Sequence, residues 1–215
     1  MKVGMLGTGT VGQALGSAFI ALGHEVMMGS RAAANENAVA WAGREGERAT
    51  AGTFTDAAAF GELVVLATRG VENEAVLRLA GPANLTGKVL IDTTNPLDFS
   101  QGMPPKLAIG HTDSAGEQVQ RLLPAARVVK AFNIVGSGLM FRPDLGGLRG
   151  DMFIAGNDDG AKATVRQILD QFGWGTIDLG GIEASRYLEP MCLAWVTHAA
   201  RTGAWNHAWK LLPAR

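Results

Sequence analysis

The sequence predicts an α/β protein, a doubly wound and mostly parallel sheet followed by a helical tail at the C-terminus. Two observations support this fold class. Short runs rich in Val, Ile and Leu alternate along the chain with segments of helical periodicity, which is typical of a parallel sheet covered by helices on both faces. After the last of these runs, a single apolar stripe at helical spacing covers residues 183–212. We therefore expect a sheet domain over residues 1–180 and a helical segment over 181–215.

Each element follows from its own pattern of apolar residues and turn residues. The expected strands are 3–6, the segment that ends in Gly29-Ser30-Arg31, 48–51, 62–68, 88–92, 127–131, 152–155 and 175–179. The expected helices are the segment from the glycine-rich turn to Gly23, then 32–43, 55–60, 72–80, 114–123 and 158–172. We expect a long loop over 93–112, and a mobile loop around a short helix over 136–150.

The first strand runs directly into Gly7-Thr8-Gly9-Thr10-Val11-Gly12, and a helix follows. In this pattern the first glycine permits a tight turn, the second lets a pyrophosphate approach the backbone, and the third allows the helix to pack on the strand. The free N–H groups of the helix then face the phosphate. A glycine turn without a ligand is the alternative, but the position between strand and helix favours a Rossmann-type dinucleotide site.

The second strand ends in Gly29-Ser30-Arg31, where NAD-binding proteins of this type carry an acidic residue for the ribose 2′-hydroxyl. Glu25 stands too early, at the start of the strand. A serine hydroxyl and the fixed fork of an arginine suit a 2′-phosphate. The end of the second strand therefore favours NADP, although Arg31 as a solvated residue before the next helix is the alternative.

Ligands of open α/β sheets lie beyond the carboxyl ends of the strands. That rule selects Thr68-Arg69-Gly70, Thr94-Asn95-Pro96 and Phe132-Asn133 in addition to the glycine turn. Thr94 and Asn95 are candidates for holding the carboxamide or ribose of the nicotinamide. Asn-Pro is also an ordinary turn element, and Asn133 is equally able to cap the next helix.

Composition excludes several other classes of function. The chain has 215 residues, 47% of them hydrophobic, and a formal net charge of −1, so there is no electrostatic case for nucleic acid. No apolar run is long enough to span a membrane, and we expect a cytoplasmic protein. The single cysteine, Cys192, lies in an apolar helical run and is expected in the core, and no metal site is predicted.

The apolar stripe of the tail holds three of the five tryptophans. Its members are Leu188, Met191, Cys192, Trp195, Ala199, Thr202, Trp205, Trp209 and Leu212. They predict one long helix, which either packs on the sheet of its own chain or lies across a homodimer interface, where large aromatic side chains are favoured.

Several motifs at the strand ends and in the tail, taken together, resemble those of one protein family. Besides the glycine turn and Met28-Gly-Ser-Arg31, the chain has Asp92-Thr-Thr-Asn-Pro-Leu97, Val128-Val-Lys-Ala-Phe-Asn133 and Ala184-Ser-Arg-Tyr-Leu-Glu-Pro190. This combination resembles the F420-dependent NADP oxidoreductases, most closely their short bacterial branch, and in part the cytosolic domains of STEAP-type ferric reductases. The resemblance implies that Thr8, Ser30 and Arg31 hold the adenylate side, and that Ala131, Phe132 and Asn133 approach the nicotinamide.

The complete set of expected cofactor-binding residues is Gly7, Thr8, Gly9, Thr10, Val11, Gly12, Ser30, Arg31, Thr68, Arg69, Thr94, Asn95, Ala131, Phe132 and Asn133. We expect an NADP(H)-dependent oxidoreductase that moves hydride between the nicotinamide and a bound acceptor, a deazaflavin (coenzyme F420) or a flavin-type ring. The loop over 136–150 and the tail helix are expected to form the walls of the acceptor site. No residue specific for a deazaflavin is recognisable.

Two other interpretations remain open at the level of sequence. A reductase of a small imine or 2-oxo compound needs a proton donor, and His111 and Tyr187 are the candidates. A non-catalytic protein that binds or senses NADP would need none. The lack of an obvious acid–base pair fits hydride transfer between two ring systems, which depends on proximity and orientation.

Overall fold

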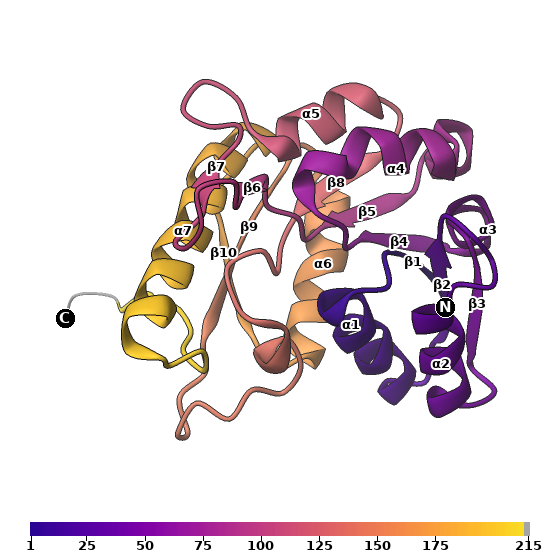
Figure 1. Ribbon diagram of the computed structural model, residues 1–215, viewed down its shortest axis with the longest axis horizontal. Helices are drawn as coiled ribbons and strands as arrows, with labels where there is room; N and C mark the ends of the chain where they lie inside the picture. The colour runs from indigo at the N-terminus through magenta and orange to yellow at the C-terminus, as the bar shows by residue number, and fades with distance from the viewer. Residues whose placement is uncertain (213–215) are drawn as a thin grey trace.

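The computed structural model describes residues 1–212 and forms one eight-stranded sheet with helices on both faces (Figure 1). The strands of this sheet are β1 (Lys2–Leu6), β2 (Glu25–Ser30), β3 (Ala49–Thr53), β4 (Leu63–Leu66), β5 (Val89–Asp92), β8 (Arg127–Lys130), β9 (Asp151–Gly156) and β10 (Gly175–Asp178). The helices are α1 (Thr10–Ala21), α2 (Glu36–Glu45), α3 (Phe54–Phe60), α4 (Asn73–Ala80), α5 (Ala115–Leu122), α6 (Asp159–Gln171) and α7 (Ser185–Thr202). Short 3₁₀ turns are η1 (Gly70–Glu72), η2 (Pro82–Leu85), η3 (Ser137–Leu139) and η4 (Ile182–Ala184).

The sheet has the order β10-β9-β8-β5-β4-β1-β2-β3. All neighbours are parallel except β8 and β9, so the prediction of a mostly parallel, doubly wound sheet is confirmed. The chain moves outward in one direction from β1 to β3 and then returns to place β4 on the other side of β1. This reversal is the topological switch point, where open α/β sheets bind their ligands.

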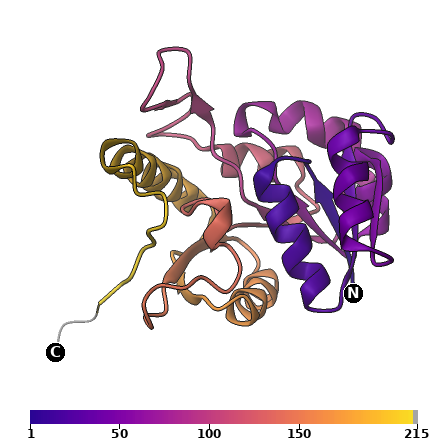
Figure 2. The same cartoon turned by 60° about the horizontal axis from the view of Figure 1, so that its bottom comes forward.

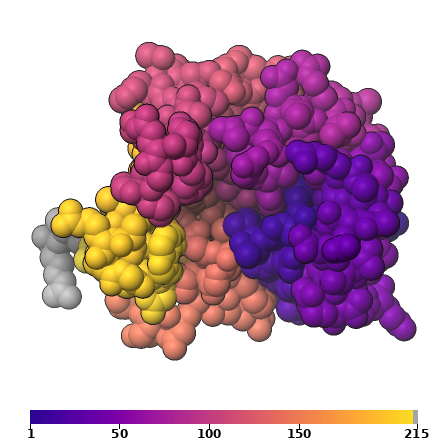
Figure 3. Space-filling model, in the orientation of Figure 1, coloured from indigo at the N-terminus to yellow at the C-terminus, as the bar shows by residue number. Residues whose placement is uncertain are grey.

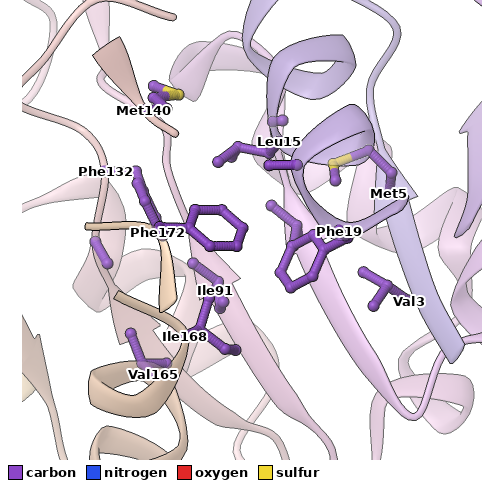
Figure 4. Packing of buried hydrophobic residues seen from close by; sticks show 14 of the residues in the cluster. Val3, Met5, Leu15, Phe19, Ile91, Phe132, Met140, Val165, Ile168 and Phe172 are labelled. Carbon is purple, nitrogen blue, oxygen red and sulfur yellow. The ribbon is translucent and has the colours of Figure 1, made fainter. Parts of the chain in front are cut away.

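Two apolar layers cover the faces of the sheet. On one face, α1, α2 and α6 pack through Leu15, Phe19, Trp41 and Ile168 against the strands. Figure 4 shows that Phe172, at the end of α6, lies between other aromatic side chains; its ring centroid is 5.2 Å from that of Phe19 and 5.7 Å from that of Phe132. The opposite face is covered by α3, α4 and α5.

The expected long loop over 93–112 contains a small hairpin, β6 (Leu97–Asp98) paired antiparallel with β7 (Lys106–Leu107). The hairpin escaped prediction because two-residue strands have no detectable alternation of apolar and polar residues. The first residues of the expected helix 32–43 form turns instead, because Asn35 caps α2 by accepting a hydrogen bond from the amide of Ala38.

The predicted tail helix is correct only as far as Thr202. Gly203 adopts a left-handed conformation (φ 73°) and ends α7, so Trp205, Trp209 and Leu212 do not continue its stripe. The segment after Gly203 runs back to the start of β9, where the carbonyl of Trp209 accepts a hydrogen bond from the amide of Asp151.

The buried side of α7 packs within its own chain, and Leu188 on α7 contacts Ala155 of β9 in one apolar cluster. Cys192 is buried, as expected. Figures 1 and 2 agree that α7, in yellow, lies on the opposite side of the molecule from the indigo strands β1–β3. Across residues 1–212, no helix combines the length and the apolar character that a membrane span requires.

Candidate functional site

A cleft of about 510 Å³ opens at the carboxyl ends of β1, β2, β4 and β5, on the switch point of the sheet. In Figure 3 the surface is hollowed between the indigo N-terminal segment and the magenta segment that holds β6 and β7. The lining residues are Gly7, Thr8, Gly9, Thr10, Val11, Ser30, Arg31, Asn35, Phe54, Ala67, Thr68, Arg69, Glu72, Val76, Thr93, Thr94, Asn95, Leu97 and Phe99. Three of the four strand-end segments selected from the sequence therefore meet in one cavity.

The glycine turn leaves room for a ligand at the start of α1. Gly7 has φ 132°, and a Cβ on Gly12 would stand 2.4 Å from the carbonyl oxygen of Gly7, so the helix packs directly on the turn. A Cβ on Gly9 would meet no atom within 4 Å, so this backbone is open toward the cleft. No side chain caps α1, and its first turn carries no acidic residue. Its unpaired amides and its positive dipole end therefore suit a pyrophosphate.

The end of β2 presents cationic and hydroxyl groups to the same cleft. Arg31 is exposed at the mouth, and the Ser30 hydroxyl lies below it, where it donates a hydrogen bond to the carbonyl oxygen of Ala32 (2.5 Å) and accepts one from its amide (3.1 Å). The only carboxylate that lines the cleft within residues 1–212 is Glu72, which forms an ion pair with Arg31 (2.9 Å) and another with Arg69. This charge distribution suits an anionic group such as a phosphate.

Hydrogen bonds between side chains join the ends of β4 and β5. The Thr68 hydroxyl donates to Oδ1 of Asn73 (3.2 Å), and Nδ2 of Asn73 donates to the Thr94 hydroxyl (2.7 Å). The Thr94 hydroxyl in turn donates to Oδ1 of Asp92 (2.7 Å). Because Asn73 is buried at the start of α4, the network fixes two threonines that line the cleft.

A fully buried lysine supports this network from below. Nζ of Lys130 lies 2.8 Å from Oδ2 of Asp92 and 2.9 Å from Oε1 of Glu189, and it donates to the carbonyl oxygen of Thr94 (2.8 Å). Burial lowers the pKa of Lys130, but the two carboxylates outweigh it and hold the pKa above its ordinary value. Burial raises the pKa of Glu189, whose carboxylate also accepts hydrogen bonds from the amides of Ala115 and Gly116.

The fourth selected segment lies behind the wall of the cleft. Ala131 and Phe132 are buried in the core, and Phe132 takes up a left-handed φ of 62° as its ring packs on Phe172. Asn133 donates one hydrogen bond to Oδ1 of Asn95 (3.0 Å), and Nδ2 of Asn95 donates to the carbonyl oxygen of Asn133 (2.8 Å). Asn133 thus orients Asn95, and direct contact of these three residues with a ligand stays a prediction.

Several residues of the site were not selected from the sequence. Glu72, Asn35, Phe54, Leu97 and Phe99 line the cleft, and the buried supports Asn73, Asp92, Lys130 and Glu189 lie behind it. Contacts such as Arg31–Glu72, Lys130–Thr94 and Ala115–Glu189 join residues 36–74 positions apart, so no local spacing indicated them. Asp92, Leu97, Lys130 and Glu189 do fall inside motifs that carry the family resemblance, which was the available signal.

The two candidates for a proton donor do not line the cleft. His111 is exposed in the loop after β7, and Tyr187 is 68% exposed on α7. Within the described part of the chain, Glu72 carries the only carboxyl group among the residues that line the cleft. The lining contains no histidine, lysine, cysteine or tyrosine from these residues. The geometry therefore offers binding and orientation rather than acid–base catalysis.

A family model described as NADP oxidoreductase, coenzyme F420-dependent, matches residues 2–96. The F420-dependent NADP reductase of Methanothermobacter marburgensis is 33% identical over 201 residues, which cover 88% of this chain and 88% of that protein. A crystal structure from Arthrobacter sp. FB24, described as "a putative F420 dependent NADP-reductase", is 40% identical with a TM-score of 0.93, covering 99% of this chain and 100% of that one.

Rat Metalloreductase STEAP3 is 29% identical over 192 residues, which cover 89% of this chain but only 36% of that protein. The chain thus spans about a third of this longer relative and nearly the full length of the reductases. Because a relative above 30% identity is matched over most of both chains, the chain belongs to the family of F420-dependent NADP reductases.

Proposed function

We propose that the protein is an NADP(H)-dependent oxidoreductase that transfers hydride between the nicotinamide and a bound deazaflavin (coenzyme F420) or flavin-type ring. The observation that carries the proposal is the cleft at the switch point, with uncapped α1 amides at its centre and Arg31 in place of the usual acid. Membership of the family supports the same activity. NADPH, when bound, supplies the hydride from its nicotinamide ring.

The chain's own residues bind and orient in this mechanism. The amides of Thr10, Val11 and Gly12 face the pyrophosphate, and Arg31 takes the 2′-phosphate. Thr94 and Asn95 form the wall at the other end, where we place the nicotinamide, and both are held by buried partners. Fixed donors keep the reacting ring at one position and orientation, which is the main requirement for direct hydride transfer.

We assign the acceptor to the side of the cleft formed by Leu97 and Phe99. Phe99 is 53% exposed and lines the cleft beside Leu97, so its ring is accessible to a ring system bound on this side. Leu97 packs against the apolar cluster of Cys192, Trp195, Val196 and Ala199. The tail helix thus packs behind Leu97; among the described residues, neither this helix nor the loop 136–150 contributes a residue to the lining of the cleft.

The choice between NADPH and NADH tests the cofactor. NADPH is expected to bind much more tightly than NADH in fluorescence titrations, and Arg31→Ala to weaken NADPH binding by about tenfold, as the loss of a charge-assisted contact implies. Arg48→Ala, at an exposed arginine outside the cleft, is the matched control. Equal affinities for NADPH and NADH, or an unchanged affinity in Arg31→Ala, would refute the assignment.

Turnover at 340 nm tests the acceptor. NADPH is mixed with the protein and, in separate reactions, with F420, FMN, FAD, imines or oxo acids. Oxidation with F420 or a flavin alone supports the proposal. Turnover with imines or oxo acids only would instead indicate a reductase of small imine or 2-oxo compounds. NADPH binding without any turnover would indicate a non-catalytic protein that senses NADP.

We further propose a homodimer that uses the outer face of α7. Tyr187, Pro190 and Ala194 are exposed and lie three and four residues apart on α7. They therefore share one outward face of the helix, which is separate from the buried stripe that packs on the sheet. Sedimentation velocity tests the proposal. The wild type is expected to sediment as a dimer and Tyr187→Glu as a monomer, whereas a monomeric wild type would refute it.

A further inference from the structure

Three charged side chains meet at the outer end of the cleft, and the proposed cofactor site does not explain one of them. Arg31 follows β2, Arg69 follows β4, and Glu72 stands on the turn η1 between β4 and α4. One oxygen of the Glu72 carboxylate pairs with Arg31 at 2.9 Å, and the other oxygen pairs with Arg69. The Glu72 carboxylate is therefore paired with Arg31, the arginine that we assign to the 2′-phosphate.

The position of Glu72 is fixed by its backbone. The amide of Glu72 donates to the carbonyl oxygen of Arg69 (2.8 Å), and the amide of Gly70 donates to the carbonyl oxygen of Asn95 (3.1 Å). A Cβ on Gly70 would stand 2.5 Å from Asn95, so the turn lies directly on the β5 loop. The backbone of Glu72 is thus held against the cleft wall, whereas Arg31 reaches the cleft through a long and largely exposed side chain.

Both arginines that pair with Glu72 are largely exposed, and they differ in how they are connected to it. The side chains of Arg31 and Arg69 are 70% and 75% exposed and that of Glu72 is 28% exposed, but Arg69 stands only three residues from Glu72, whereas Arg31 comes from the end of another strand. Exposed ion pairs hold their partners weakly, because water and salt compensate both charges. A phosphate dianion carries more charge than a carboxylate and offers three acceptor oxygens, so it binds an arginine fork more strongly.

We propose that Glu72 is a specificity-determining residue that competes with the cofactor's 2′-phosphate for Arg31, and that Arg69 retains Glu72 once Arg31 has been released. This inference rests on the proposed NADP function. Because Arg69 keeps its ion pair, the displaced carboxylate is never left without a cation. A ribose 2′-hydroxyl carries no charge and leaves the Arg31–Glu72 pair intact, so the competition acts only on phosphorylated ligands.

Calorimetric titration with two small ligands isolates this contact. The first, 2′,5′-ADP, carries the 2′-phosphate; the second, 5′-AMP, lacks it. In Glu72→Gln the Kd of 2′,5′-ADP is expected to fall by about fivefold, the size of one exposed ion pair, while the Kd of 5′-AMP stays within about twofold. The matched control is Glu74→Gln, since Glu74 lies two residues further on and pairs with Arg78 outside the cleft.

A double-mutant cycle tests the role of Arg69. Arg69→Gln is expected to weaken 2′,5′-ADP binding by about threefold in the wild-type background, because Glu72 then holds Arg31 alone. The same substitution is expected to have no effect when Glu72 is already Gln. Equal weakening in both backgrounds would show that Arg69 contacts the ligand itself and would overturn this part of the inference.

The results separate this inference from the proposed function. If the wild type binds 2′,5′-ADP no more tightly than 5′-AMP, the NADP assignment fails. If the wild type prefers 2′,5′-ADP but Glu72→Gln leaves its Kd unchanged or raises it, only the competition fails. An increase in Kd would mean that Glu72 orients Arg31 for the phosphate.

Discussion

Replacing Lys130 with Met tests the buried support of the cleft. In the native protein, Nζ of Lys130 contacts the carboxylates of Asp92 and Glu189 and the carbonyl oxygen of Thr94, all within 2.9 Å. Methionine fills a similar volume but carries no charge. The two carboxylates, which are at most 1% exposed, would then face each other without a cation.

The size of the effect follows from this geometry. Removing one partner of a buried ion pair costs about 3–5 kcal/mol, because a buried charge is left uncompensated. That is a large share of the roughly 5–15 kcal/mol by which domains are stable. For a chain of this length, Tm should fall by about 6–20 °C, at roughly 2–4 °C per kcal/mol.

The deficit should depend on pH in a defined direction. Lys130 has a raised pKa, so in the wild type its contribution is complete below its ordinary pKa and is lost only as the pH rises through the higher folded value. In Lys130→Met, stability recovers as the pH falls, because a carboxyl that takes up a proton relieves the repulsion. Glu189, whose pKa burial already raises, is the group expected to do so.

Urea unfolding followed by tryptophan fluorescence, at pH 5 and pH 8, measures both effects. Adding Glu189→Gln to Lys130→Met is expected to restore part of the loss. Lys106→Met is the control, since Lys106 is exposed and hydrogen-bonds only with Gln101 through its ammonium group within the described residues. A loss under about 1 kcal/mol at pH 8, or an equal loss at both pH values, would refute the reasoning.

Two further predictions concern the glycine turn and the single thiol. In Gly12→Ala the new Cβ would stand 2.4 Å from the carbonyl oxygen of Gly7, so α1 must shift. We expect NADPH binding to weaken by about tenfold or more and the Tm to fall. An unchanged affinity for NADPH would contradict the packing argument. Burial raises the pKa of Cys192 to about 12, so the thiol is neutral at pH 8 and should react with a disulfide reagent only after unfolding in urea; rapid reaction of the native protein would contradict its burial.

The order of the main strands and helices could be predicted because the central strands are short, apolar runs with turn residues at both ends. Runs such as Leu63–Leu66 are buried on both faces, as the strands of a parallel sheet between two layers of helices are. The length of the tail helix could not be predicted from its stripe alone. Tryptophans at helical spacing continue beyond Thr202, and Gly203 was the local stop signal that outweighed them.

The residues of the cleft that lie close together in the sequence could be predicted. Those that reach the cleft only through tertiary contacts could not. Gly7, Ser30 and Arg31 lie within the first strand–helix–strand unit, so their spacing is informative. Glu72 lies 41 positions from Arg31, and Glu189 lies 73 positions from Gly116. Such pairs are set by the sheet order, which brings distant strand ends together, and a single sequence carries no signal for the pairing.

The dependence of the cleft on Glu189 has a consequence for biosynthesis. Gly7 to Phe99, which hold all the lining residues, are translated well before the α7 carboxylate that compensates Lys130 and caps the α5 amides. A nascent chain halted before residue 189 can form the strands from β1 to β8, since domains begin to fold during synthesis. Such a chain lacks the Glu189 carboxylate that accepts hydrogen bonds from Lys130 and the α5 amides. Lys130 is then less well fixed, and so is Thr94, whose carbonyl oxygen accepts a hydrogen bond from it. We therefore expect capture of the dinucleotide to begin only after α7 has been translated and has docked.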